Sequence, residues 1–351
     1  LNDHGIKVNV DFSEHKGHAM KVARSLAYAP EKTICGLGGD GTMHEIINGI
    51  MCRPPEERMP VGLLPGGTGN SFLEDVGGFN FNDALGMIIR ADHTNIDLFK
   101  VHLDDSCHFA FNVCGWGMFA SANAVAESLR CVKKNRYHVA GLWEIIRNRS
   151  QQARLTFDSQ TMEGIFSLIV ASNTRNVGKS MMLSPSAKFD DGKMDLTFLK
   201  QSGRWALLRL FQKLPKGNHI HEPGISCIQC KEFEIVALKT TLWNLDGEIY
   251  SGKRARVTVL PHALSRNNVF SSRLPISAGK THHNPCSLTR DFIWKCMPDE
   301  VSDDLKINSP KPPFFQTSIP PGAGTNFTLN GFHSLAFCKA VDILSAVCPM
   351  P

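Results

Sequence analysis

The stretch "GLGGDGTMHEIINGI", Gly36 to Ile50, decides how this chain is interpreted. Its glycines lie between a predicted strand and a predicted helix, so backbone N–H groups and a helix N-terminus meet at one point, which favours an anion. Gly38, Gly39 and Gly41 let the backbone approach a phosphate without a Cβ in the way. Asp40 would repel a phosphate unless it binds a cation or accepts a proton from a nucleophile. A plain turn or N-cap role for Asp40 is the alternative.

A second stretch, "VGLLPGGTGNSFLEDVG" from Val61 to Gly77, repeats this arrangement. Gly67 again frees the backbone, and Thr68 offers a hydroxyl donor, as Thr42 does in the first loop. Loops at the carboxyl ends of neighbouring parallel strands share one crevice. The two loops therefore predict a single phosphate site, although their spacing is neither GxGxxG nor that of the Walker loop.

The pattern of strands and helices changes along the chain. Up to about Arg90, short apolar runs alternate with amphipathic stretches, which indicates βαβ units and a parallel sheet. After Asn95, β-rich runs separated by turn signals indicate antiparallel strands. We expect an α/β protein with a three-layer nucleotide-binding domain over 1–93 and a β-rich sandwich domain over 94–262. The Pro-, Ser- and Asn-rich tail 263–351 is predicted to be mostly disordered.

Composition sets limits on function. The chain has 351 residues, 42% hydrophobic residues and a net charge of +5, with Lys and Arg scattered, so nucleic acid is not indicated. Of the 11 Cys, only Cys227 and Cys230 form a CxxC, which favours reduced thiols over zinc. No apolar run reaches the ~18 residues of a membrane span. We expect a cytoplasmic protein whose mild positive charge would suit an anionic ligand or an anionic membrane surface, with its oligomeric state open.

Four ordered motifs resemble a known family. The two glycine loops, "SPSAKFDDGKMDLTFL" and "LWNLDGEIYSG" are similar to the diacylglycerol kinase catalytic domain family, which includes sphingosine, ceramide and bacterial lipid kinases. "SEHKGHAMKVA" also agrees, and "MHEIINGIMCRPPE" is closest to the sphingosine kinase branch. The resemblance spans Val8 to Leu264. It implies an NAD kinase-like fold and an ATP- and Mg²⁺-dependent lipid kinase. The γ-phosphate would go to a hydroxyl of a sphingoid base, diacylglycerol or ceramide, which the enzyme would reach by peripheral association with a membrane.

The resemblance also implies roles for particular residues. The acids that would act in catalysis are Asp40, Asp246 and Glu248, and family members differ over which is the base. Without the resemblance, "LDGE" would be interpreted as a hairpin turn, because Asp-Gly is a strong hairpin signal. The nucleotide would be held by residues from three parts of the chain: Ser13, Gly38, Gly39, Asp40, Gly41, Thr42, Glu45, Gly67, Thr68, Arg130 and Arg136.

Two further sites are implied by the family. A structural Mg²⁺ would bind Asp191 and the backbone oxygens of Lys188 and Lys193, with a plain turn as the alternative. The lipid would meet Asn123 and Ser121. Sphingosine kinases have an Asp at the position of Asn123, and an Asn cannot pair with an ammonium group, so neutral lipids stay open.

One departure from the family concerns its opening loop. Relatives begin with a strand and an Asn-Pro-x-Ser-Gly loop that contributes to ATP binding, and this chain starts after that point, at Leu1. A non-catalytic relative that binds nucleotide or lipid is therefore an alternative. An NAD kinase also carries "GGDGT", but "GGTGNS" and "LDGE" speak against it.

Overall fold

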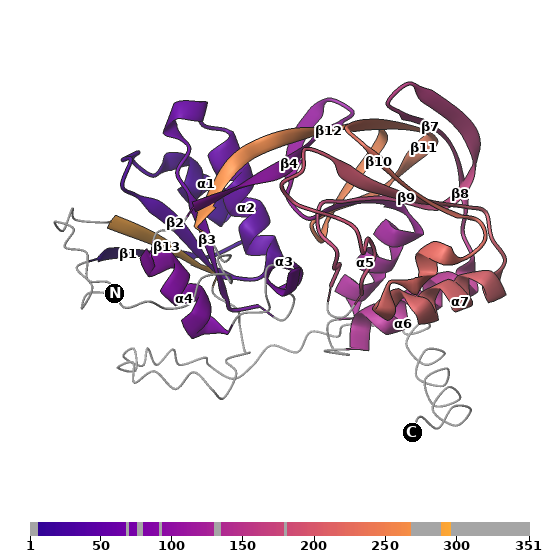
Figure 1. The fold of residues 1–351 in the computed structure, drawn as a ribbon, viewed down its shortest axis with the longest axis horizontal. Helices are drawn as coiled ribbons and strands as arrows, with labels where there is room; N and C mark the ends of the chain where they lie inside the picture. Colours follow the sequence, from indigo (N-terminus) through magenta and orange to yellow (C-terminus); the bar gives the residue numbers. More distant parts are fainter. Residues whose placement is uncertain are drawn as a thin grey trace, which may run out of the picture. The chain divides into compact units, whose positions relative to one another are not determined.

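The structure is a computed structural model, and it describes residues 6–67, 70–75, 80–90, 93–129, 135–178, 181–267 and 289–295. These residues all belong to one unit, residues 1–298 (Figure 1). Thr68, Arg130 and most of the tail lie outside the described residues.

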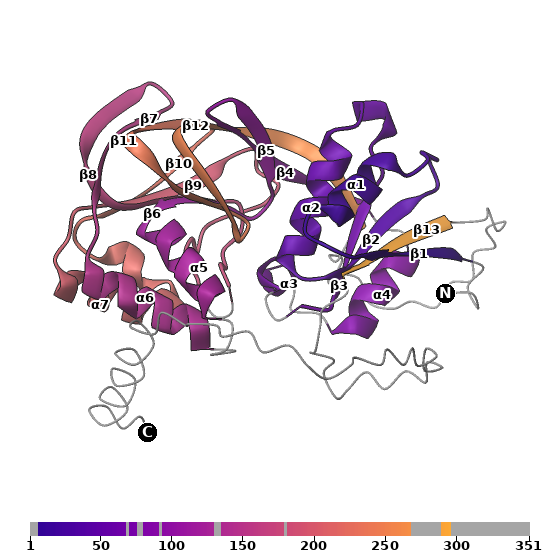
Figure 2. The same cartoon turned by 180° about the vertical axis from the view of Figure 1, so that it is seen from behind.

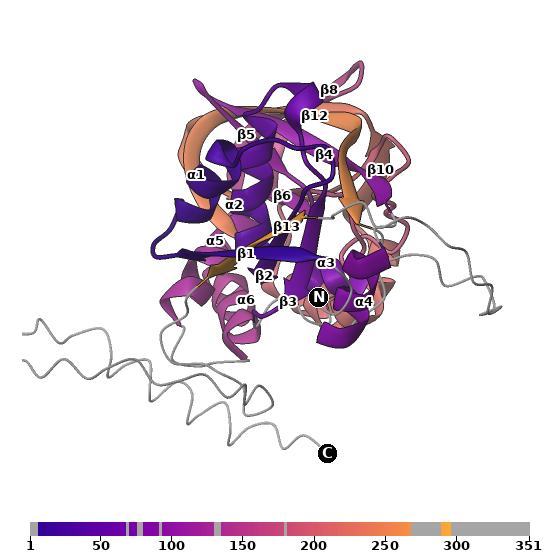
Figure 3. The same cartoon turned by 90° about the vertical axis from the view of Figure 1, so that its left-hand side faces the viewer.

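The first half alternates strands with helices. Its elements are β1 (Lys7–Ser13), α1 (His18–Ser25), β2 (Thr33–Gly38), α2 (Asp40–Met51), η2 (Pro55–Glu57), β3 (Val61–Pro65), α3 (Ser71–Asp75) and α4 (Phe81–Arg90). Strands β1, β2 and β3 run parallel, with β13 (Thr289–Lys295) between β1 and β2. In Figure 3 this sheet lies between α1 and α2, above it, and α4, below it. The predicted parallel sheet is confirmed.

Both faces of the parallel sheet carry helices, because its strands are apolar on both sides. Ile34 of β2 and Leu63 of β3 pack with α1 and α2, whereas Cys35 and Leu64, on the opposite face, pack with α4. A Cβ at Gly49 of α2 would lie 2.9 Å from the Cβ of Ala23, so glycine lets α1 and α2 approach closely. This is the predicted three-layer arrangement.

The second half is an antiparallel sheet with helices on one side (Figures 1 and 2). Two of its tryptophans, Trp116 and Trp243, are fully buried in the core. The prediction of an antiparallel β-rich domain is confirmed. Its strands are β4 (His93–Leu103), β5 (Ser106–Ala110), β6 (Val113–Gly117), β7 (Gln151–Phe157), β8 (Gln160–Ser172), β9 (Met194–Lys200), β10 (Ile225–Cys230), β11 (Glu232–Leu245) and β12 (Glu248–Asn267). Its helices are α5 (Met118–Ser128), α6 (Arg136–Arg147), α7 (Arg204–Lys213), η4 (Leu214–Lys216) and η5 (Asn218–His221).

Two long strands, β4 and β12, run from one half into the other and pair with each other along their length. Where their register shifts, Asp97 of β4 is fully buried. Its carboxylate accepts hydrogen bonds from the amides of Gly192 (2.6 Å) and His262 (2.7 Å). A buried carboxylate bonded in this way fixes the crossing point of the two strands.

The tail holds more strand than the sequence predicted. β12 continues to Asn267, and β13 pairs in parallel with β1 and β2, although 263–351 was expected to be mostly disordered. The segment "TRDFIWK" is short and flanked by residues without periodicity, and its partners lie far away in sequence. Local pattern therefore gave no signal for this pairing.

Candidate functional site

The two glycine loops contact each other through their backbones. Gly38 and Pro65, the last residues of β2 and β3, are paired in the sheet, and the amide of Gly66 donates to the carbonyl of Gly38 (3.0 Å). A Cβ on Gly67 would lie only 2.7 Å from the Cα of Gly39. Gly39 is also the N-cap residue of α2, so no side chain caps the N-terminus of this helix. The prediction of one shared crevice agrees with this geometry, which fits a phosphate group.

Asp40 lies at the junction of both loops. Its Oδ2 accepts hydrogen bonds from the amide and the hydroxyl of Ser71 (3.0 and 2.7 Å), and its Oδ1 accepts one from the amide of Phe72 (3.5 Å). Desolvation raises the pKa of Asp40 to about 6. The hydrogen bonds from Ser71 and Phe72 act in the opposite direction but are outweighed. The amide of Gly178 donates to the same Ser71 hydroxyl (2.9 Å), so the second half of the chain also contacts this group.

The remaining predicted nucleotide residues of the first half surround the start of α2. Thr42 is buried, and its hydroxyl has no hydrogen-bond partner among the described residues. Ser13 is buried at the end of β1. Glu45 accepts hydrogen bonds from the amides of Gly17 (2.9 Å) and Ala19 (3.2 Å), so it holds the turn between β1 and α1. The unpaired Thr42 hydroxyl is a donor that a phosphate oxygen could satisfy.

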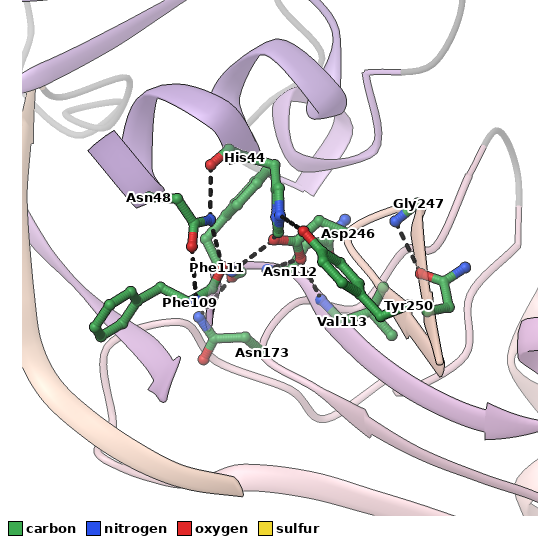
Figure 4. Close-up of polar contacts among 11 residues, drawn as sticks. His44, Asn48, Phe109, Phe111, Asn112, Val113, Asn173, Asp246, Gly247 and Tyr250 are labelled. Carbon is green, nitrogen blue, oxygen red and sulfur yellow. Dashed lines mark hydrogen bonds and ion pairs between the residues drawn. The ribbon is translucent and has the colours of Figure 1, made fainter. Parts of the chain in front are cut away.

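Asp246 is brought to α2 from the second half (Figure 4). Its Oδ1 accepts hydrogen bonds from the amides of Asn112 and Val113 (both 2.9 Å), and its Oδ2 accepts one from that of Phe111 (3.1 Å). His44 Nδ1 lies 2.9 Å from Asp246 Oδ2, and it donates because a carboxylate only accepts. Both carboxylate oxygens are therefore engaged, and Asp246 positions its hairpin against α2.

The hairpin that carries Asp246 has the expected turn. Asp246 and Gly247 have positive φ angles of 54° and 98°, as a two-residue type I′ turn requires. The side-chain amide of Asn123 on α5 donates a hydrogen bond to the backbone carbonyl of Gly247 (2.6 Å). This predicted lipid-contacting residue therefore stabilises the turn. Ser121 is half-buried on the same helix.

Glu248 follows this turn and lies over the first glycine loop. A Cβ on Gly41 would be 3.3 Å from Glu248 Oε1, and the Glu248 carboxylate forms an ion pair with Lys16. Tyr250 lies 3.1 Å from His44 Nε2, and burial followed by the charge of Glu248 raises the pKa of Tyr250 to about 12. The tyrosine hydroxyl therefore stays protonated and donates to the imidazole.

Of the two predicted arginines, Arg136 is described. It begins α6, forms an ion pair with Glu127 (3.2 Å) and donates to the hydroxyl of Tyr137 (2.9 Å). Burial, with smaller contributions from the charges of Glu127 and Asp40, raises the pKa of Tyr137. The start of α6 thus lies within electrostatic range of Asp40.

The predicted metal loop forms a turn. Asp191 is exposed, and its Oδ1 accepts a hydrogen bond from the amide of Lys193 (3.0 Å), while Lys188 and Lys193 are exposed. Within the described part of the chain, no three His, Cys, Asp or Glu side chains are grouped to hold a metal ion. The predicted site uses one carboxylate and two backbone oxygens rather than such a group, so metal binding by Asp191, Lys188 and Lys193 stays a prediction beside the plain turn.

Several residues at this site were not anticipated. Ser71, His44 and Lys16 contact the acids Asp40, Asp246 and Glu248, respectively. The only available signal for His44 was its place four residues after Asp40, on the same side of a helix.

A second unanticipated link ties α3 to the second half. Buried Asp75 accepts hydrogen bonds from the amide of Arg175 (2.7 Å) and the side chain of Asn176 (2.9 Å). Asn48 similarly exchanges two hydrogen bonds with the backbone of Phe109 (2.8 and 2.9 Å). These contacts, together with the Asp246 bonds, hold the two halves around the glycine loops.

Comparisons with known proteins agree with this geometry. Residues 1–101 match the "Diacylglycerol kinase catalytic domain" and residues 112–266 the "YegS C-terminal NAD kinase beta sandwich-like domain". The chain is 28% identical over 266 residues to "Probable lipid kinase YegS-like" of Enterobacter sp. (strain 638), covering 76% of this chain and 87% of that protein.

Two more relatives bear on the fold. The chain is 25% identical over 281 residues to "Sphingosine kinase 1" of Arabidopsis thaliana, covering 66% of this chain and 58% of that protein. A solved structure of a diacylglycerol kinase from Bacillus anthracis str. Sterne shares the fold, with a TM-score of 0.55 and 19% identity, covering 73% of this chain and 83% of that one. None of the helices in the described residues is long and apolar enough to cross a membrane. Since the two family matches cover both halves of the described fold, this chain belongs to the diacylglycerol kinase catalytic domain family of lipid kinases.

Proposed function

We propose that this chain transfers the γ-phosphate of ATP to a hydroxyl group of a membrane lipid. The observation that carries the proposal is Asp40, a half-buried residue at the junction of two glycine loops that fit a phosphate, whose carboxylate is hydrogen-bonded to Ser71 and has its pKa raised by desolvation to about 6. A turn residue in the same loop would need neither the burial nor the bonds from Ser71. Retention of Glu248 beside Gly41 argues in the same direction.

In this proposal the nucleotide phosphates are bound at the start of α2. The backbone of the two glycine loops and the Thr42 hydroxyl would donate to phosphate oxygens, and Lys16 and Arg136 would supply positive charge nearby. Glu45 would act indirectly: its carboxylate accepts a hydrogen bond from the amide of Gly17 and so positions the turn that carries Lys16. ATP would supply the transferable phosphoryl group, with Mg²⁺ bound to its phosphates.

Asp40 is the proposed proton acceptor. As the lipid hydroxyl oxygen forms its bond to the γ-phosphorus and the bond to ADP breaks, the hydroxyl proton passes to the Asp40 carboxylate. A pKa near 6 suits this role at neutral pH, since the group is ionised yet still basic enough to accept. Glu248, which forms an ion pair with Lys16, is the second candidate.

For the lipid we propose a neutral acceptor, diacylglycerol or ceramide, ahead of a sphingoid base. Asn123 carries no charge, and its amide already donates to the carbonyl of Gly247. An ammonium group on the lipid would therefore find no carboxylate at this position of α5. The relatives do not decide between these lipids, since one is named a lipid kinase and the other a sphingosine kinase.

The proposal is tested by offering labelled ATP to one preparation of the full chain with sphingosine, ceramide, diacylglycerol and NAD⁺ in parallel, the lipids in mixed micelles. We expect label in ceramide or diacylglycerol. Label in sphingosine alone would refute the neutral-lipid assignment, and label in NAD⁺ alone would favour an NAD kinase. A folded chain that binds ATP and labels none of the four would be a binding relative.

A further inference from the structure

Helices α6 and α7 lie side by side on the second half of the chain (Figures 1 and 2). They pack closely because α6 has a glycine at the contact: a Cβ on Gly141 would lie 2.7 Å from Cε2 of Phe211. Their inner faces bury Ile145, Leu207 and Leu210. The inner faces thus account for ordinary core packing and leave the outer faces to be explained.

The outer faces carry large apolar side chains. Trp205 at the start of α7 is 82% exposed, and Trp143 and Ile146 on α6 are 36% and 49% exposed. Arg204 Nε donates to the carbonyl of Ile146 (2.8 Å), which brings Trp205 to the end of α6. Both exposed tryptophans among the described side chains therefore belong to this one pair of helices.

The same region concentrates positive charge. Residues 136–149 and 204–222 contain seven Lys and Arg against two Glu, a net charge of +5, which equals that of the whole chain. Glu144 is buried and paired with Arg147, and Glu222 is paired with Arg209 and Lys213. The outer face is therefore both aromatic and basic.

We infer that this face of α6 and α7 docks on an anionic lipid bilayer. Tryptophan is favoured at the boundary between headgroups and acyl chains, and each basic residue near an anionic surface adds attraction. A second copy of the chain is disfavoured, because two such faces would bring like charge together. The inference rests on the proposed lipid kinase function and adds the surface by which the enzyme would reach its substrate.

The position of the face suits this role. α6 packs against α5, and Asn123 of α5 contacts the turn of Asp246 and Gly247 beside the glycine loops. Arg136 begins α6, and Trp143 and Ile146 follow on the same helix. Docking through the outer face of α6 would thus bring a bilayer to the helix that leads into the site.

The test measures flotation of the full chain with vesicles of phosphatidylcholine, with and without phosphatidylserine. We expect binding only with phosphatidylserine. Trp205→Ser should weaken this binding about tenfold, and Arg149→Gln about fivefold. The effect of Arg149→Gln should disappear at high salt, because salt screens electrostatic attraction. Leu238→Ser is the matched control, because Leu238 is 69% exposed but belongs to β11 and not to these helices, so its loss should leave vesicle binding unchanged.

The inference is overturned if the parent binds neither kind of vesicle, or if Leu238→Ser weakens binding as much as Trp205→Ser. It is also overturned if sedimentation shows that Trp205→Ser dissociates a dimer instead. Transfer to a short-chain diacylglycerol dissolved as monomers separates this inference from the proposed function. Trp205→Ser should leave that transfer unchanged. A parent that binds vesicles but transfers no phosphate to any lipid would refute the kinase and leave the docking face standing.

Discussion

Replacing Asp40 by Asn should make the protein more stable at neutral pH while removing its activity. Asp40 is half-buried, and desolvation of its carboxylate raises the pKa from 3.8 to about 6. The folded state therefore binds a proton more tightly than the unfolded state does. Ionisation of Asp40 in the folded protein is unfavourable, and the Asn side chain, which cannot ionise, escapes this cost.

The sign and size of this stability difference follow from the linkage between proton binding and folding. Below about pH 4 the carboxyl is protonated in both states, and its contribution to stability is fully present. As pH rises through the folded pKa of about 6, that contribution is lost, up to about 3 kcal/mol at neutral pH. Between about pH 4.5 and about pH 7.5, the parent should lose about 2 kcal/mol relative to Asp40→Asn.

Urea denaturation at a series of pH values measures this difference in the free energy of unfolding. Comparing slopes with pH cancels any constant effect of the Asn side chain on the bonds from Ser71. Asp190→Asn is the control for loss of one negative charge, because Asp190 is exposed. A stability difference between parent and Asp40→Asn that does not change with pH would refute the assigned burial and pKa of Asp40.

Three further outcomes follow from the site. Gly67→Ala puts a Cβ 2.7 Å from the backbone of the first glycine loop. It should weaken ATP binding in calorimetry about tenfold, whereas Gly203→Ala, with nothing within 4 Å of its Cβ, should not. Asp246→Ala leaves three buried amides unpaired and should lower the free energy of unfolding by about 3 kcal/mol, measured in urea. Glu45→Gln loses one acceptor at the start of α1 and should cost about 1 kcal/mol in the same experiment; unchanged stability would contradict its bracing role.

Local patterns were sufficient to predict the architecture. The alternation of strands and helices before Arg90 gave the parallel sheet, and α7 lies over Arg204–Lys213, as expected, because its apolar residues recur at helical spacing. The expected strands of the second half form because period-two runs bury one face. β13 escaped prediction, since its pairing with β1 and β2 is not encoded near residues 289–295.

The site was predictable only in part. The meeting of the two glycine loops follows from parallel strands, whose carboxyl ends share one edge. The contact of Ser71 with Asp40 depends on how α3 turns back, and that of His44 with Asp246 joins residues 202 positions apart. Sequence spacing carries no information on such bonds. Asp246 was expected among the chemical acids, but the backbone amides that occupy both of its oxygens become visible only in the folded chain.

The most direct test of the central claim compares the parent with Asp40→Asn in transfer of labelled phosphate from ATP to lipid in mixed micelles, with ATP binding measured on both proteins. We expect labelled lipid with the parent and at least about a hundredfold less with the variant, with ATP binding retained. Parent and variant labelling the same lipid at equal rates would contradict the assignment of Asp40 as the proton acceptor.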